Sequence, residues 1–211
     1  MSSTTYTASP SRTERAARLA QRRATRRRRL VALMVAIGAV VIAVPLISPL
    51  FHHAVEEIAL PLRHEDIIRQ QARDKNLDPA LIAAVIYTES RFVEGRTSSA
   101  GAQGLMQITP ETAADIARTS GGVAFTTKDL ATPQVNIAYG SYQLRHLLDR
   151  YDGDEAAALA AYNAGPGKAD AWGGSGLRVR DIPYPETRAY VQRVLAVRGQ
   201  YRRKYAAELG L

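Results

Sequence analysis

The feature that most constrains this chain is an uncharged run of 22 residues, 30–51, with the sequence LVALMVAIGAVVIAVPLISPLF. Coiled as a helix, such a run is about 33 Å long, which is enough to cross the hydrocarbon core of a bilayer. A buried helix of a soluble protein is a poor alternative, because Pro45 and Pro49 interrupt the run and soluble helices of this length usually carry charge. The sequence therefore predicts a single transmembrane helix over residues 30–51.

The charges around this run predict its orientation. Residues 1–29 hold nine Arg and one acidic residue, Glu14, and the four arginines Arg26 to Arg29 directly precede the run. Because positively charged flanks stay inside, we expect a disordered cytoplasmic arm at 1–29 and the rest of the chain on the outer face of the cell membrane. The alternative is a cleaved signal peptide with Val41-x-Ala43 as the cleavage pattern, although the charged region before it is long for a signal.

The positive charge of the chain is confined to this arm. The formal net charge is +8, and nine Arg minus one Glu in the arm already give +8, so residues 30–211 are formally neutral. A nucleic-acid partner is therefore not expected. The chain has no Cys, and its four His are scattered, at positions 52, 53, 64 and 146. These counts exclude a thiol nucleophile and disulfides, and they lead us to expect no metal and no cofactor.

Beyond a short connector at 52–61, apolar residues recur at helical spacing, and no alternating run is long enough for a core strand. A polar residue followed by Pro, the usual start of a helix, occurs at Asp78, Thr109 and Thr132, and Asp154 is expected to cap a further helix. The expected helices lie at 65–76, 79–90, 110–118, 133–151, 155–163 and 185–205, separated by segments rich in Gly, Ser or Thr at 97–104, 120–127, 165–167 and 173–176.

These elements predict one all-α domain of six or seven helices over residues 62–207. A segment of that length is large enough to bury a single hydrophobic core. No internal repeat is present.

Glu89 is the residue whose position suggests chemistry. On a helical period it shares a face with Ile82, Val85 and Ile86, so its carboxyl group lies on the apolar side of the expected helix. Removal from water favours the protonated form of a carboxyl group and raises its pKa, as a general acid requires. The alternative is an acid one turn beyond the buried stripe that points to water, which is the usual place for a helical Glu.

Two further stretches have the composition of ligand-binding segments. Residues 98–113, SSAGAQGLMQITPETA, are rich in Gly and include the amide of Gln107, and Gly lets backbone approach a ligand closely. Residues 157–168, AALAAYNAGPGK, place Tyr162 and Asn163 at the end of an Ala-rich helix, where a tyrosine hydroxyl is able to bind a carboxyl group. Plain structural interpretations also exist: a loop between helices, and a core tyrosine beside a helix-ending Asn.

Taken in order, these stretches resemble the catalytic domain of the soluble-type lytic transglycosylases, which share the all-α, lysozyme-like fold of the goose-type lysozymes. The resemblance covers about residues 62–205 and rests on four ordered motifs: Glu89-Ser90, Gly104-Leu105-Met106-Gln107, Ala161-Tyr162-Asn163-Ala164-Gly165 and Glu186-Thr187-Arg188-x-Tyr190-Val191. The sequence departs from the usual pattern at Ser99-Ala100 and in the short segment 173–185, which are both expected to flank the substrate groove.

The resemblance implies an enzyme that cleaves the β-1,4 bond between N-acetylmuramic acid and N-acetylglucosamine in peptidoglycan glycan strands. It implies that Glu89 first protonates the glycosidic oxygen and then, as a base, takes the proton of the muramoyl C6 hydroxyl, which closes a 1,6-anhydro ring in place of water. The residues expected to bind substrate or to support Glu89 are Ser90, Ser98, Gly104, Met106, Gln107, Tyr162, Asn163, Glu186 and Tyr190.

Two other functions are compatible with the sequence. A muramidase on the same fold uses water instead of the C6 hydroxyl and needs a second carboxylate, for which Glu186 is the best candidate. An ion pair between Glu186 and Arg188 explains the same residue equally well. The third possibility is a wall-binding scaffold protein without activity. An acid on an apolar helix face argues against that possibility, because a pure binding protein has no need of one.

Overall fold

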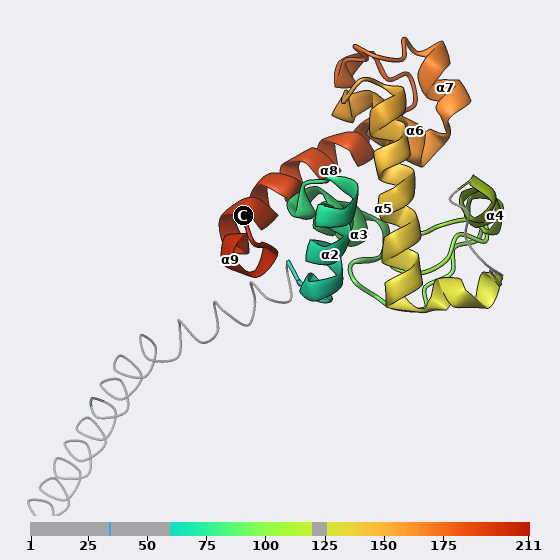
Figure 1. Cartoon of the computed structure of the whole chain (residues 1–211). Helices are drawn as coiled ribbons and strands as arrows, with labels where there is room; N and C mark the ends of the chain where they lie inside the picture. The colour runs from blue at the N-terminus through green and yellow to red at the C-terminus, as the bar shows by residue number, and fades with distance from the viewer. Residues whose placement is uncertain (1–33, 35–59, 120–125) are drawn as a thin grey trace, which may run out of the picture. The chain divides into compact units, whose positions relative to one another are not determined.

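The structure is a computed structural model, and it describes Met34 and residues 60–119 and 126–211 (Figure 1). The chain divides into two units, residues 1–56 and 57–211, and every described residue apart from Met34 belongs to the second unit. In the described ranges, no helix is both long and apolar enough to cross a membrane. The predicted arm, and the predicted anchor apart from Met34, lie outside the described residues.

The described part of the second unit is helical, and its only β-type pairing consists of isolated bridges. Its α-helices are α2 (Glu65–Lys75), α3 (Pro79–Ser90), α4 (Pro110–Thr119), α5 (Pro133–Arg150), α6 (Glu155–Ala164), α7 (Pro166–Ala171), α8 (Pro185–Lys204) and α9 (Ala206–Leu209). Two 3-10 helices, η1 (Thr127–Ala131) and η2 (Val179–Asp181), complete it. The all-α prediction is confirmed, and each predicted helix has a counterpart whose ends agree within one residue.

Helix starts follow the local signals of the sequence with one exception. The carboxylate of Asp78 accepts a hydrogen bond from the Ala80 N–H (2.9 Å), and that of Asp154 accepts from the Ala157 N–H (3.0 Å). Thr132 behaves differently, because its hydroxyl donates to the carbonyl oxygen of Asp129 (2.8 Å). The reason is that Thr132 both ends η1 and precedes α5, and its side chain binds the first of these two helices.

Helix α7 begins in a segment that the sequence assigns to a linker. Gly165 has a φ of 92°, a conformation that favours glycine, and it turns the chain between α6 and α7. Contacts with the end of α5 then hold the short helix: Asp170 forms an ion pair with Arg150 (2.6 Å) and accepts a hydrogen bond from the Tyr151 hydroxyl (2.9 Å). Both partners are distant in sequence, so local signals do not predict this helix.

Helix α3 is the centre of the core. Residues 80–86 are all buried, so the helix is enclosed on every side, and its most extensive packing is against α8. The predicted apolar face with Ile82, Val85 and Ile86 is buried, and the rest of this stretch is buried as well. Glu89 lies in the last turn of α3, where the full enclosure ends.

The last long helix, α8, is joined to the start of the domain. The hydroxyl of Tyr201 donates to the carbonyl oxygen of Pro61 (2.5 Å), and that of Tyr205 donates to the carbonyl oxygen of Leu60 (2.7 Å). These bonds close the domain between residues 140 or more positions apart. They attach the C-terminal end of the helix that carries Tyr190 to the segment before α2.

Candidate active site

The carboxyl group of Glu89 has the properties of an acid near neutral pH. Burial raises its pKa from the usual 4.5 to about 7. Two neighbours act in the opposite direction: the hydroxyl of Tyr190 on α8, and the guanidinium of Arg96 in the loop after α3. The balance leaves the pKa of this carboxyl group close to neutral pH, the range in which a general acid works.

Two tyrosines from different helices are within electrostatic reach of this carboxyl group. Burial, followed by the charge of Glu89, raises the pKa of Tyr162 on α6 and of Tyr190 on α8 well above the usual range. Both hydroxyls therefore keep their protons at neutral pH. The buried Tyr190 hydroxyl has no hydrogen bond of regular geometry among the described residues, so it is available to a carboxylate or to a bound sugar.

The Tyr162 hydroxyl is bound to the backbone of the Gly-rich loop. It donates to the carbonyl oxygen of Met106 (3.0 Å), across 56 positions of sequence. The N–H of the same residue, Met106, donates to Oδ1 of Asn136 on α5 (2.7 Å). The structure thus brings the predicted residues Glu89, Tyr162, Tyr190 and Met106 together at the ends of α3 and α6 and on α8.

Asn136 is a residue of this site that sequence reasoning missed. It is fully buried, and its Nδ2 donates to the carbonyl oxygens of Gln103 (2.8 Å) and Leu130 (3.0 Å) while Oδ1 accepts from Met106. One residue of α5 thereby ties the Gly-rich loop to η1. The available signal was a polar residue four positions before Gly140 on the buried face of a helix, where an amide needs partners.

Two glycines allow the loop to lie this close to α5. Gly104 has a φ of 78°, and a Cβ there would lie 2.2 Å from Nδ2 of Asn136 and 2.6 Å from the carbonyl oxygen of Leu130. A Cβ at Gly140 would lie 2.4 Å from the sulfur of Met106, whose side chain is fully buried. Protein atoms therefore lie close to Gly104, and the predicted close approach of a ligand there stays a prediction.

The other polar residues of the loop are engaged within it. Gln107 has a φ of 50°, and its Nε2 donates to the carbonyl oxygens of Gly104 (2.8 Å) and Arg96 (3.1 Å). The hydroxyl oxygen of Ser98 accepts from the Ala102 N–H (3.1 Å) and closes a tight turn. The predicted substrate contacts of Gln107 and Ser98 stay predictions.

Three predicted residues form no hydrogen bond or ion pair with Glu89 in the described part of the chain. Ser90 is buried, and its hydroxyl donates to the carbonyl oxygen of Ile86 (3.1 Å), within its own helix. Asn163 is exposed at the end of α6, and Glu186 is exposed in the first turn of α8. Arg188 donates to the carbonyl oxygen of Ile182 (2.9 Å), and within the described ranges no ion pair joins it to Glu186.

Arg96 carries the charge that acts on Glu89, and it lies outside the four motifs of the sequence. Its carbonyl oxygen accepts hydrogen bonds from the Gly104 N–H (2.8 Å) and from the Gln107 side chain, which fix the loop that carries it. A single exposed Arg in a loop has no sequence signal of its own. Only the folded chain brings its guanidinium near the end of α3.

Replacing this residue gives a test of the local electrostatics. We expect Arg96→Gln to raise the pKa of Glu89 further above 7 by a fraction of a unit, because a positive charge that favours the carboxylate is lost. The shift should shrink at high salt, since Arg96 is exposed. An NMR titration of the Glu89 carboxyl carbon measures it, with Arg118→Gln as a control whose ion pair is with Asp115. Equal titration curves for both variants would contradict this account.

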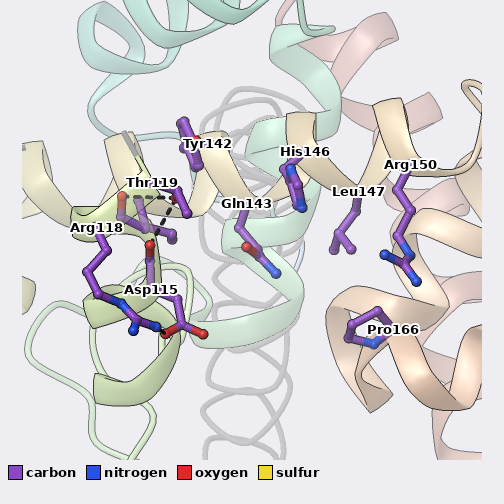
Figure 2. Close-up of a pocket in the computed structure, with 10 residues that line it drawn as sticks. Asp115, Arg118, Thr119, Tyr142, Gln143, His146, Leu147, Arg150 and Pro166 are labelled. Atoms are coloured by element: carbon purple, nitrogen blue, oxygen red, sulfur yellow. Dashed lines mark hydrogen bonds and ion pairs between the residues drawn. The ribbon is translucent and has the colours of Figure 1, made fainter. Parts of the chain in front are cut away.

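A cavity of about 340 Å³ lies between α4, α5 and α7 (Figure 2). Figure 2 shows Thr119 of α4 beside Tyr142 of α5 at one end of the cavity and Pro166 of α7 at the other end. None of the predicted site residues lines this cavity. In the described part of the chain, no group of three or more His, Asp or Glu side chains could hold a metal ion.

This chain is similar to known proteins in sequence and in fold. The soluble lytic murein transglycosylase of Salmonella typhimurium is 34% identical over 159 residues, which cover 69% of this chain and 24% of that protein. Membrane-bound lytic murein transglycosylase C of Histophilus somni is 37% identical over 114 residues, covering 50% of this chain and 31% of that protein. A crystal structure of an inactive glutamate-to-glutamine mutant of lytic transglycosylase Slt from Pseudomonas aeruginosa superimposes with a TM-score of 0.67 at 34% identity, covering 72% of this chain and 26% of that one.

This chain therefore spans only about a quarter of the length of the soluble relative and of the solved structure. The family described as "Transglycosylase SLT domain" matches residues 66–179, more than half of the chain. That range contains Glu89, the Gly-rich loop, Asn136 and Tyr162. The chain belongs to the transglycosylase SLT-domain family and has its all-α, lysozyme-like fold.

Proposed function

We propose that this protein is a peptidoglycan lytic transglycosylase that cleaves the bond between N-acetylmuramic acid and N-acetylglucosamine and leaves 1,6-anhydro ends. The observation that carries the proposal is one partly buried carboxyl group, Glu89, with a pKa of about 7 at the meeting point of the family's motifs. The names of the relatives, lytic murein transglycosylases, support the same reaction and substrate class.

In the first step, protonated Glu89 donates its proton to the glycosidic oxygen, and the leaving sugar departs as an alcohol. The negative charge left on Glu89 is favoured by the Tyr190 hydroxyl and the Arg96 guanidinium, the two groups that lower its pKa. The N-acetyl group of the muramoyl residue assists the positive charge that develops at C1. The substrate thereby takes the part that a second carboxylate has in ordinary glycosidases.

In the second step, the Glu89 carboxylate removes the proton of the muramoyl C6 hydroxyl, and the C6 oxygen bonds to C1. The 1,6-anhydro ring closes, no water is consumed, and Glu89 is protonated again for the next cycle. One group acts as acid and then as base, so a pKa close to the working pH serves both steps.

The surroundings of Glu89 favour this reaction over hydrolysis by a muramidase. A second carboxylate close enough to activate water would raise the pKa of Glu89 by repulsion between like charges. The groups that act on Glu89 by hydrogen bonding or charge are Tyr190 and Arg96, and no carboxylate is among them in the described part of the chain. Glu186, the best candidate from the sequence, is exposed.

We propose further that residues 30–51 anchor the protein in the cell membrane, with residues 1–29 in the cytoplasm and the catalytic domain on the outer face. The four arginines before the uncharged run support this orientation. A relative from Histophilus somni is named as membrane-bound.

The deciding experiment incubates the full chain, kept in solution with detergent, with purified peptidoglycan and analyses the released fragments by mass spectrometry. We expect muropeptides one water lighter than hydrolysis products, and none with the Glu89→Gln variant. Reducing-end products would indicate a muramidase and direct the search for a second carboxylate to Glu186 first. No release by a folded protein would favour a wall-binding scaffold.

A further inference from the structure

The Tyr162 hydroxyl has one proton, and this proton takes part in one hydrogen bond within the protein. The hydroxyl donates to the carbonyl oxygen of Met106 at 3.0 Å, and a carbonyl oxygen can only accept. Tyr162 is nevertheless close enough to Glu89 for the carboxylate charge to raise its pKa. Its one hydroxyl proton is therefore already bound, and none is left to donate to the Glu89 carboxylate.

Three groups interact electrostatically with the Glu89 carboxyl: Tyr190 from α8, Arg96 from the loop after α3, and Tyr162 from α6. Tyr190 and Arg96 favour the charged form, whereas Tyr162 is not among the donors to Glu89. The difference between the two tyrosines is that the proton of Tyr162 is already engaged, while the Tyr190 hydroxyl has no other partner among the described residues.

The acceptor of this hydrogen bond, the Met106 carbonyl, belongs to a residue that Asn136 holds in place. The peptide N–H of Met106 donates to Oδ1 of Asn136 at 2.7 Å, and the two Nδ2 hydrogens of Asn136 bind the carbonyl oxygens of Gln103 and Leu130. Both N–H groups of the Asn136 amide thus have carbonyl partners, and its oxygen has an N–H partner. Only one orientation of the amide satisfies all three bonds. Because Asn136 is fully buried, water cannot replace any of these bonds without cost.

We propose that Asn136 is a positioning residue. It holds the Met106 carbonyl where that carbonyl accepts the hydrogen bond of the Tyr162 hydroxyl, and so it prevents this hydroxyl from donating to the Glu89 carboxylate. The inference deepens the proposed function, because it names what maintains the acid form of Glu89. Without Asn136 the Met106 peptide moves, and the freed hydroxyl of Tyr162 turns to the carboxylate. A hydrogen bond to a charged acceptor is among the stronger ones in proteins, and it lowers the pKa of the acid.

The test measures the pKa of Glu89 directly, by NMR titration of the full chain labelled with ¹³C in the Glu carboxyl groups. The Glu89→Gln variant identifies the signal. Relative to wild type, we expect Asn136→Ala to lower the pKa of Glu89 by about one to two units. The Tyr162→Phe variant should leave the pKa near the wild-type value, and the double variant should return it there, because no hydroxyl is left to turn.

Each variant is able to overturn the inference. An unchanged pKa in Asn136→Ala, or a lowered pKa that persists in the double variant, would mean that Asn136 acts only on packing. Tyr162→Phe differs from wild type by one oxygen, so it remains informative even if Asn136→Ala does not fold. A clear rise of the Glu89 pKa in Tyr162→Phe would mean that Tyr162 donates to Glu89 in the native protein. Asn163→Ala, at an exposed Asn next to Tyr162, is the matched control and should leave the pKa unchanged.

This titration is independent of the reaction. If the pKa values follow the expected pattern but no anhydro products form, the positioning role stands and the proposed function fails. If anhydro products form and the Glu89 pKa is the same in all variants, the proposed function stands and the positioning role of Asn136 fails. In an active protein, the pH above which Asn136→Ala loses activity should fall by the same number of units as its Glu89 pKa.

Discussion

Glu89→Gln is expected to lower the rate of glycan release by about 10³-fold or more, because both the acid and the base of the proposed reaction are lost. The amide cannot protonate the glycosidic oxygen, and it cannot take the proton of the C6 hydroxyl. The rate of soluble muropeptide release from purified peptidoglycan measures the effect. Glu94→Gln is the control, since Glu94 is an exposed acid only five residues away whose carboxylate binds His64 (2.9 Å). A Glu89→Gln protein that keeps a tenth of the activity would refute the single-acid mechanism.

The same substitution should stabilise the fold, and the pH dependence of that gain follows from the pKa of Glu89. The folded pKa of about 7 lies above the usual 4.5, so the folded state holds the proton more tightly than the unfolded state. The stability from this group is fully present below pH 4.5 and is lost as the pH rises through 7. Removing the titrating group should therefore raise stability by up to about 3 kcal/mol above pH 7.

Thermal unfolding of wild type and Glu89→Gln at pH 4 and pH 8 tests this expectation. The two melting temperatures should agree closely at pH 4 and separate at pH 8, with the variant higher. Equal melting temperatures at pH 8 would mean that the carboxylate is well solvated in the folded state, and the physical basis for its role as an acid would be lost. A gain in stability on loss of a catalytic group is the expected direction for an active site.

Gly104→Ala is expected to have the largest effect on folding. The residue has a φ of 78°, and the added Cβ would lie 2.2 Å from the Asn136 side chain and 2.6 Å from the carbonyl oxygen of Leu130, so the loop must move. Left-handed backbone and overpacking together should lower the free energy of unfolding by about 2–5 kcal/mol. Activity should fall as well, because the same loop carries Met106, the acceptor of Tyr162.

Gly101→Ala separates the two causes. Gly101 has a φ of 82°, but a Cβ there meets nothing within 4 Å. That variant should therefore lose only about 1–2 kcal/mol, from backbone strain alone. Urea unfolding of the two variants beside wild type gives the comparison. Equal losses in the two variants would show that the clash of the added Cβ with Asn136 and Leu130 does not lower the free energy of unfolding.

The sequence alone determined the parts of this protein that depend on local interactions. Helix starts at Asp78 and Asp154 are set by a carboxylate that binds an N–H two or three residues further on, so a short window of sequence contains the whole signal. Helical periodicity and Pro at first positions placed six helices. Ordered motifs then indicated the SLT-domain family, with Glu89, Met106, Tyr162 and Tyr190 among the predicted site residues.

Only the tertiary structure decided which contacts hold the site in place and what pKa its acid, Glu89, has. Met106 donates a hydrogen bond to Asn136, 30 positions away, and accepts one from Tyr162, 56 positions away. No local sequence pattern contains such pairs. The full enclosure of α3, the helix α7 held by Tyr151, and the nearness of Arg96 to Glu89 arise in the same way. The pKa of Glu89 depends on burial and on charges that meet only after folding, because desolvation and Coulomb interactions act through space rather than along the chain.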